Sequence, residues 1–168
     1  MSQEGIDMLI EDLQSNDPVV RQVAREQLVR VGGQNATRAL VGELADPRRH
    51  VRWEAAKALA EIADPVAAPA LMQMLDDVDE DVRWVAGEGL VALGKVGVIT
   101  VLSGLPKRAE SVDFCQGAHH VLHDLKKTCG CGETIAPVLE ALEEAEPAVT
   151  APPAALKALI ALKTGDEH

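Results

Sequence analysis

The sequence LADPRRHVRWEAAKALAEI at residues 44–62 decides the fold, because the same pattern occurs twice more at a spacing of 31 residues. LQSNDPVVRQVAREQLVRV precedes it at residues 13–31, and LDDVDEDVRWVAGEGLVAL follows it at residues 75–93. No residue is inserted or lost between the three copies. Self-similarity at a fixed spacing of this size is the sequence signature of a tandem-repeat protein.

Each copy is predicted to form a hairpin of two helices. Within residues 51–62 the apolar side chains fall on one stripe of a helical wheel, and most residues there favour helix. Asp46-Pro47 is predicted to cap this helix, and Asp64-Pro65 opens the next one. One hairpin is too thin to bury its own apolar stripe, so neighbouring hairpins must stack. We therefore expect an all-α fold, an α-solenoid of stacked antiparallel helix hairpins with about ten helices.

The repeats predict a single domain that covers residues 1–168. Regular 31-residue repeats occupy residues 1–105, and residues 106–168 form divergent repeats in which the register drifts. A helix at residues 4–15 matches the second helix of a hairpin whose first helix is missing. It is therefore expected to cap the N-terminal end of the stack.

The divergent part predicts helices with less regular spacing. A helix at residues 96–105 should end before Pro106, because proline cannot continue a helical hydrogen-bond ladder. Two further helices are expected at residues 110–127 and 133–145. The proline-rich residues 147–153 are expected to break the chain before a last helix. Five apolar residues of that last helix should cover the open end of the core: Ala155, Leu156, Leu159, Ile160 and Leu162.

Composition limits the classes of partner. Of the 168 residues 47% are hydrophobic, but the chain has only two Trp, one Phe and no Tyr, so Ala, Leu and Val must fill the core. A formal net charge of −11 argues against binding nucleic acid or an anionic membrane surface. Residues 1–14 lack the features of a signal peptide, and no apolar run approaches the ~20 residues of a membrane span. Three cysteines, an odd number, favour a reducing compartment, and we expect a cytoplasmic protein.

The pattern Leu-x-Asp-Pro-x3-Val-Arg-x6-Leu-x2-Ile over residues 44–62 resembles the HEAT-like repeat, in the short form found in phycobilin lyases and deoxyhypusine hydroxylase. The resemblance covers residues 1–105 closely and the remainder loosely. It implies an α-solenoid, and it implies a protein-binding surface because such repeats mostly serve as one.

In the related repeats, the arginine of the Val-Arg pair usually bonds to an aspartate of the turn. The resemblance therefore implies that Arg21, Arg52 and Arg83 form a structural ladder with Asp46 and Asp77. Such charge-assisted hydrogen bonds would stabilise each layer of the stack.

Deoxyhypusine hydroxylase carries a His-Glu dipeptide just after the Val-Arg pair, and these dipeptides bind two irons. The matching dipeptides in this chain are Gln22-Val23, Trp53-Glu54, Trp84-Val85 and Gln116-Gly117. Glu54 alone matches the motif, and a di-iron site needs several converging ligands. The di-iron activity is therefore not expected.

Trp53 and Trp84 are 31 residues apart and so occupy the same place in adjacent repeats. On a helical wheel each lies about 170° from the apolar stripe of its own helix, so both should point away from the core of their hairpin. Tryptophan is enriched at the energetic centres of protein interfaces. We predict a protein-binding surface of Trp53 and Trp84 with Lys57 and Glu88, one turn onward on the same side. The alternative is that each ring covers the seam between repeats.

A second candidate site combines six residues that bind zinc well as thiolate or imidazole. On the predicted helix at residues 110–127, the histidines fall on the polar side, and a Cys-Gly-Cys turn follows that could close over them. The spacing matches no standard zinc motif, so a surface helix with scattered histidines and reduced cysteines is the alternative, and a Cys-Gly-Cys redox pair is another. The six residues are Cys115, His119, His120, His123, Cys129 and Cys131.

The sequence thus favours a non-catalytic scaffold or adaptor whose partner is another protein, and it predicts no cofactor, with zinc as the one possible exception. The first alternative is a metal-binding enzyme or regulator that uses His119, His120, His123, Cys129 and Cys131. The second is a cofactor or chromophore lyase, which only the repeat's resemblance suggests.

Overall fold

The computed structural model describes residues 1–165, and within them it contains ten α-helices, one short 3-10 helix and no strand. The predicted all-α fold is therefore confirmed. Residues 166–168, the end of the predicted domain, lie outside the described residues. None of the helices in residues 1–165 combines the length and apolarity needed to cross a membrane. The helices are α1 (Gln3–Leu13), α2 (Pro18–Val31), α3 (Gly33–Glu43), α4 (Arg49–Ile62), η1 (Pro65–Ala67), α5 (Ala68–Met74), α6 (Glu80–Ala92), α7 (Lys95–Arg108), α8 (Val112–Leu125), α9 (Gly132–Glu143) and α10 (Pro147–Thr164).

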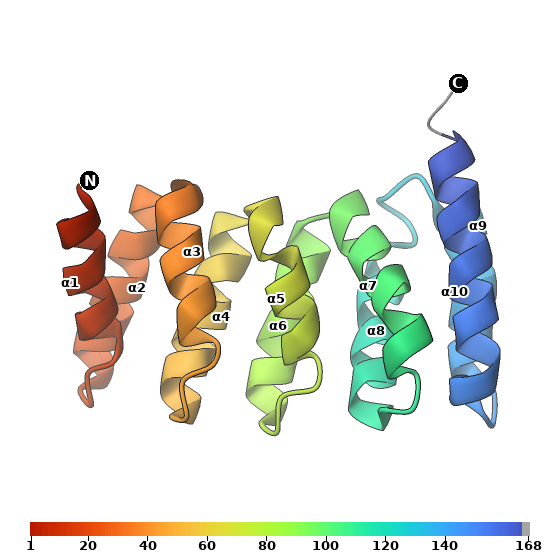
Figure 1. The fold of residues 1–168 in the computed structure, drawn as a ribbon, viewed down its shortest axis with the longest axis horizontal. Helices are drawn as coiled ribbons and strands as arrows, with labels where there is room; N and C mark the ends of the chain where they lie inside the picture. Colours follow the sequence, from red (N-terminus) through yellow and green to blue (C-terminus); the bar gives the residue numbers. More distant parts are fainter. Residues whose placement is uncertain (166–168) are drawn as a thin grey trace.

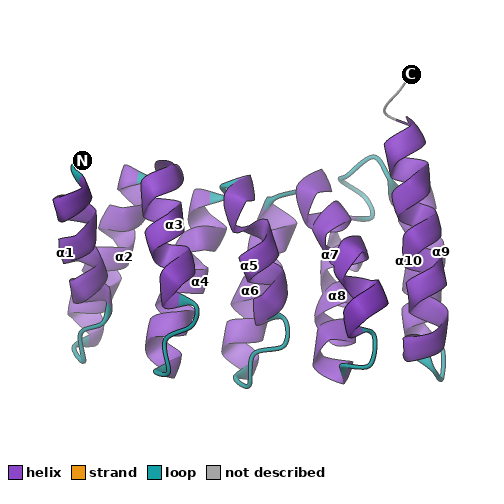
Figure 2. Ribbon diagram, viewed as in Figure 1, coloured by secondary structure: helices purple, strands orange, loops and turns teal. Residues whose placement is uncertain are grey.

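The helices stack in two layers along one axis (Figure 1). Helices α1, α3, α5 and α7 form the front layer in this view, and α2, α4, α6 and α8 form the layer behind it. Figure 2 shows that short turns join most helices, whereas a longer loop leads from α8 to α9. The stacked antiparallel hairpins are those that the 31-residue spacing predicts.

Residues in register between repeats build the core between the layers. Leu28, Leu59 and Leu90 are fully buried on the rear helices α2, α4 and α6. Each such leucine contributes about 2 kcal/mol of burial free energy. Phe114 is also fully buried, on α8, so the divergent fourth repeat joins the same core.

Helix α4 begins at Arg49, two residues later than its predicted start. The Asp46 carboxylate accepts a hydrogen bond from the backbone N–H of Arg48 at 2.8 Å and a second from the Arg48 side chain. It thereby closes a local turn before the helix instead of capping the helix itself. The side-chain hydrogen bond from Arg48 also lowers the pKa of Asp46.

The arginine ladder is correct at one position and differs at another. Arg52 donates two hydrogen bonds to Asp77, at 2.8 Å from Nε and 3.0 Å from Nη2, and this pair raises the pKa of Arg52. Arg21 instead donates to two backbone carbonyls of the preceding turn. Its expected partner, Asp46, is already occupied by Arg48.

The prolines near the C-terminus do not end helices as predicted. Helix α7 continues through Pro106 to Arg108, and α10 runs unbroken from Pro147 through Pro152 and Pro153. A proline leaves the carbonyl four residues earlier without its helical partner. In α10 those carbonyls belong to the exposed Ala148 and Val149, where water can bind them.

The last two helices reverse the order of the layers. Helix α9 packs beside α8 in the rear layer, and α10 packs beside α7 in the front layer. The expectation that α10 covers the open end holds for Ala155 and Leu162, which are buried. It is wrong for Leu156 and Ile160, which are 50% and 65% exposed, because no further helix of residues 1–165 stacks on that side of α10.

Candidate functional site

The two tryptophans occupy equivalent places but different environments. Trp53, on α4, is partly buried and packs against the hydrophobic core. Trp84, on α6, is 58% exposed. The helical wheel gives the direction of both rings relative to their own hairpin. It does not include the neighbouring repeat, which covers one ring more than the other.

The predicted protein-binding residues line one groove. Trp53 and Lys57 on α4 and Trp84 and Glu88 on α6 form its walls, and the groove has a volume of about 310 Å³. The remaining lining residues are Ala60, Asp81 and Val85. The structure therefore brings the four predicted residues together between two successive repeats.

A second groove of about 390 Å³ lies on the other side of Trp84, between α6 and α8. Its charged lining residues are mostly acidic: Glu80, Asp81 and Asp113 against Arg83. Arg83 lies 3.5 Å from Asp113, which balances part of the basic charge. Trp84 thus separates two grooves of the rear layer.

His120 of α8 stacks on Trp84 across the seam between the third and fourth repeats. The two ring centroids are 4.5 Å apart, and the rings are inclined by 28°. Gly87 makes room for the contact, because a Cβ at that position would lie 3.2 Å from His120 Cδ2. The imidazole therefore supports one side of the exposed indole.

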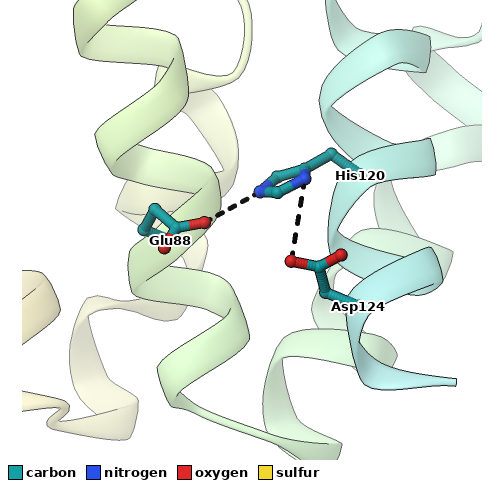
Figure 3. Close-up of side chains that lie close together, drawn as sticks. All are labelled: Glu88, His120 and Asp124. Carbon is teal, nitrogen blue, oxygen red and sulfur yellow. Dashed lines mark hydrogen bonds and ion pairs between the residues drawn. The ribbon is translucent and has the colours of Figure 1, made fainter. Parts of the chain in front are cut away.

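The same imidazole lies between two carboxylates (Figure 3). His120 Nε2 is 2.9 Å from Glu88 on α6, and His120 Nδ1 is 3.9 Å from Asp124, one turn along α8. One ligand atom from each of the three residues lies within 4.8 Å of the others. This cluster of Glu88, His120 and Asp124 is called the seam cluster below.

The sequence missed the seam cluster as a unit, although a signal for it exists. Counting 31 residues from Lys57 gives Glu88, and counting 32, the drifted spacing of the fourth repeat, gives His120. The three residues therefore hold one place in successive repeats. Equivalent side chains of stacked repeats face each other across the seam.

The other histidines point elsewhere. His119 Nε2 is 2.9 Å from Glu143 on α9, and its ring stacks on that of His123 with centroids 5.9 Å apart. His120 faces α6 instead, so the structure does not bring the three predicted histidines together around one point.

The cysteines do not meet the histidines either. Cys129 and Cys131 form a disulfide across Gly130, which has a positive φ of 70° that glycine adopts without strain. This differs from the expectation of reduced cysteines, and in this state neither sulfur is available to zinc. Cys115 is buried and donates its S–H to the Ala109 carbonyl, and burial raises the pKa of its thiol.

Glu54, the one residue that matches the di-iron motif, is buried in an ion-pair cluster. Its carboxylate accepts a hydrogen bond from Arg25 at 2.9 Å and lies 3.7 Å from Arg21. Arg25 also reaches Glu61 at 2.7 Å. These contacts account for a carboxylate at position 54 in structural terms.

Comparisons with known proteins agree on the fold. A family model for HEAT repeats matches residues 6–91, about half of the chain. The structure is similar to that of the complex of CpcE and CpcF of phycocyanin lyase from Nostoc sp. PCC7120, with a TM-score of 0.54 and 24% identity. That match covers 98% of this chain and 66% of the other. An engineered protein matches with a TM-score of 0.45 and 21% identity over 96% of this chain and 81% of its own. No curated protein matches the sequence.

Proposed function

Because the chain belongs to the HEAT-repeat family, we propose that it is a non-catalytic scaffold that binds another protein through the rear-layer face around Trp84. Helical repeats of this kind present extended surfaces, and each repeat adds a helix to that surface. The contact surface is the pair of grooves on either side of Trp84, with Trp53, Lys57 and Glu88 in one of them.

The observation that carries this proposal is the exposure of Trp84 in a chain that has only two tryptophans. An exposed indole is a large apolar surface that a partner can bury, and tryptophan is enriched among residues whose loss weakens binding most. The stack on His120 holds the ring in place before binding. A held side chain loses less conformational entropy when a partner arrives.

The charges around Trp84 favour a partner with a basic segment. Glu80, Asp81 and Asp113 line the groove between α6 and α8, and the whole chain carries a net charge of −11. A basic segment would be attracted to this groove, and an apolar side chain beside it would contact the indole.

The lyase alternative gains little support from the similarity to phycocyanin lyase. That similarity is one of fold, at 24% identity, and the chain spans 66% of the length of that protein's chain. It identifies no residue here that would hold or attach a chromophore.

Affinity capture tests the proposal. The immobilised protein, its Trp84→Ala variant and a Met8→Ala control are incubated with an extract of the source cells, and bound proteins are quantified by mass spectrometry. Met8 is 68% exposed on α1 in the front layer, so its loss removes a comparable exposed apolar group from the other face. We expect specific partners on the parent and on Met8→Ala that are depleted on Trp84→Ala. Equal retention by all three proteins would contradict the proposed surface.

A further inference from the structure

We propose that the seam cluster of Glu88, His120 and Asp124 is a zinc-binding site that links the third and fourth repeats. This inference does not depend on the proposed protein-binding function. It also differs from the zinc site that the sequence suggested, because it uses His120 without His119, His123 or a cysteine.

The positions of the three side chains carry the proposal. One ligand atom from each lies within 4.8 Å of the other two, before any ion draws them together. Zinc holds nitrogen and oxygen ligands at about 2.0–2.2 Å in a tetrahedron, which places ligand atoms roughly 3.3 Å apart. Glu88 and Asp124 are both exposed, so small rotations of their side chains close the remaining distance.

The imidazole is positioned from two sides. Its ring stacks on Trp84 at 4.5 Å, and Gly87 leaves the space that the ring occupies against α6. Supporting contacts of this kind fix the direction of a ligand and strengthen metal binding. His120 is therefore held in place, and the carboxylates supply the adjustable ligands.

The donor set selects the class of ion. One imidazole with two carboxylates suits zinc and related first-row transition metals, whereas Mg²⁺ and Ca²⁺ prefer oxygen ligands alone. Two carboxylates neutralise the charge of a divalent cation. Three protein ligands leave the fourth position of a tetrahedral zinc ion to water or to another molecule.

The position of the cluster gives the ion a structural consequence. Glu88 belongs to α6, whereas His120 and Asp124 belong to α8, so the bound ion would connect two repeats. Unfolding separates these helices and destroys the site. Zinc should therefore raise the stability of the folded chain, as any ligand does that binds the native state alone.

Isothermal titration calorimetry of the untagged protein with ZnCl₂ tests the site. We expect about one zinc ion per chain and an affinity that falls by more than about 10-fold in His120→Ala and in Glu88→Gln. Glu88→Gln keeps the size of the side chain and the stack of His120 on Trp84, so its loss of binding cannot come from a lost ring. Titration with MgCl₂ is expected to give no comparable binding.

Two control variants separate this site from the other candidate ligands. His119→Ala/His123→Ala removes the stacked pair beside Glu143, and Cys129→Ser/Cys131→Ser removes the disulfide cysteines. Both are expected to bind zinc as the parent does. Circular dichroism in EDTA is recorded for every variant to establish that each one folds.

Two results would overturn the proposal. One is a folded parent that binds no zinc, which would leave the seam cluster as a hydrogen-bonded bridge between carboxylates. The other is zinc binding that survives in His120→Ala and Glu88→Gln but disappears in either control variant. Neither result bears on capture of a protein partner by Trp84.

Discussion

Trp53 and Trp84 hold the same place in adjacent repeats, yet Trp53 packs partly buried against the core while Trp84 is 58% exposed. The difference arises from the neighbouring repeat on each side. It separates a tryptophan that stabilises the fold from one that is free to contact a partner.

This asymmetry predicts unequal effects on stability. Trp53→Ala should lower the free energy of unfolding by about 2 kcal/mol, because it removes packed apolar surface and leaves a gap beside the core. Trp84→Ala should lower it by less than about 1 kcal/mol, as expected for an exposed side chain. Urea unfolding of both variants measures the two values. Equal losses of several kcal/mol would show that Trp84 is packed and would remove it as a surface residue.

The Arg52–Asp77 pair should be a major contribution to the seam between the second and third repeats. Its two hydrogen bonds, at 2.8 and 3.0 Å, lie in a largely buried place. Asp77→Ala leaves the guanidinium without its partner and should cost about 3 kcal/mol. Arg52→Lys keeps the charge but loses the two-pronged geometry, so it should cost less than Asp77→Ala. Unfolding of each variant in urea measures both, and a cost near zero for Asp77→Ala would contradict the assignment.

Glu54 should act through its arginines. Glu54→Gln keeps the shape of the side chain but leaves Arg25 and Arg21 facing a neutral amide, at an expected cost of about 2 kcal/mol. Thermal unfolding in EDTA, compared with unfolding after addition of Fe²⁺, measures both the cost and any role of metal. Iron-dependent stabilisation that Glu54→Gln abolishes would mean that Glu54 is a metal ligand after all.

His50 should make stability depend on pH. Burial, followed by repulsion from Arg21 and Arg48, lowers its pKa in the folded chain, and its buried Nε2 has no hydrogen-bond partner among residues 1–165. The unfolded chain binds the proton at its ordinary pKa of about 6.5, so it holds more protons than the folded chain just below that pH. The contribution of neutral His50 is complete above about pH 6.5 and is lost as the pH falls toward the lowered folded pKa.

The matched variant for this test is His50→Gln. Between about pH 7.5 and about pH 5.5 the parent should lose more stability than the variant, because glutamine has no proton to gain. Thermal unfolding across this range gives both curves. Parallel curves would rule out His50 as the source of the pH dependence.

The sequence predicted the regular part of the fold because one physical constraint repeats there. Leu28, Leu59 and Leu90 keep the 31-residue register, and each helix that carries them must bury the same stripe. Past Arg108 the register is lost, and with it the information about which helix packs on which. The reversed order of α9 and α10 depends on the loop of residues 126–131, which no periodic pattern describes.

The candidate site was predictable in part. A helical wheel places Trp84 and His120 on the polar side of their own helices, but it does not specify which neighbouring helix they face. His119 and His120 are adjacent in sequence, and the structure directs them to α9 and α6 respectively. Their partners are set by the stacking of whole repeats, which a single helix cannot show.

Site-specific photo-crosslinking in living cells tests the binding surface most directly. A photo-reactive phenylalanine derivative replaces Trp84 in one protein and Met8 in the other, since both positions are exposed but lie on opposite layers. The account predicts discrete crosslinked proteins after irradiation when the probe stands at position 84, and few or none when it stands at position 8. No crosslinked protein at position 84, or the same set at both positions, would contradict a binding surface around Trp84.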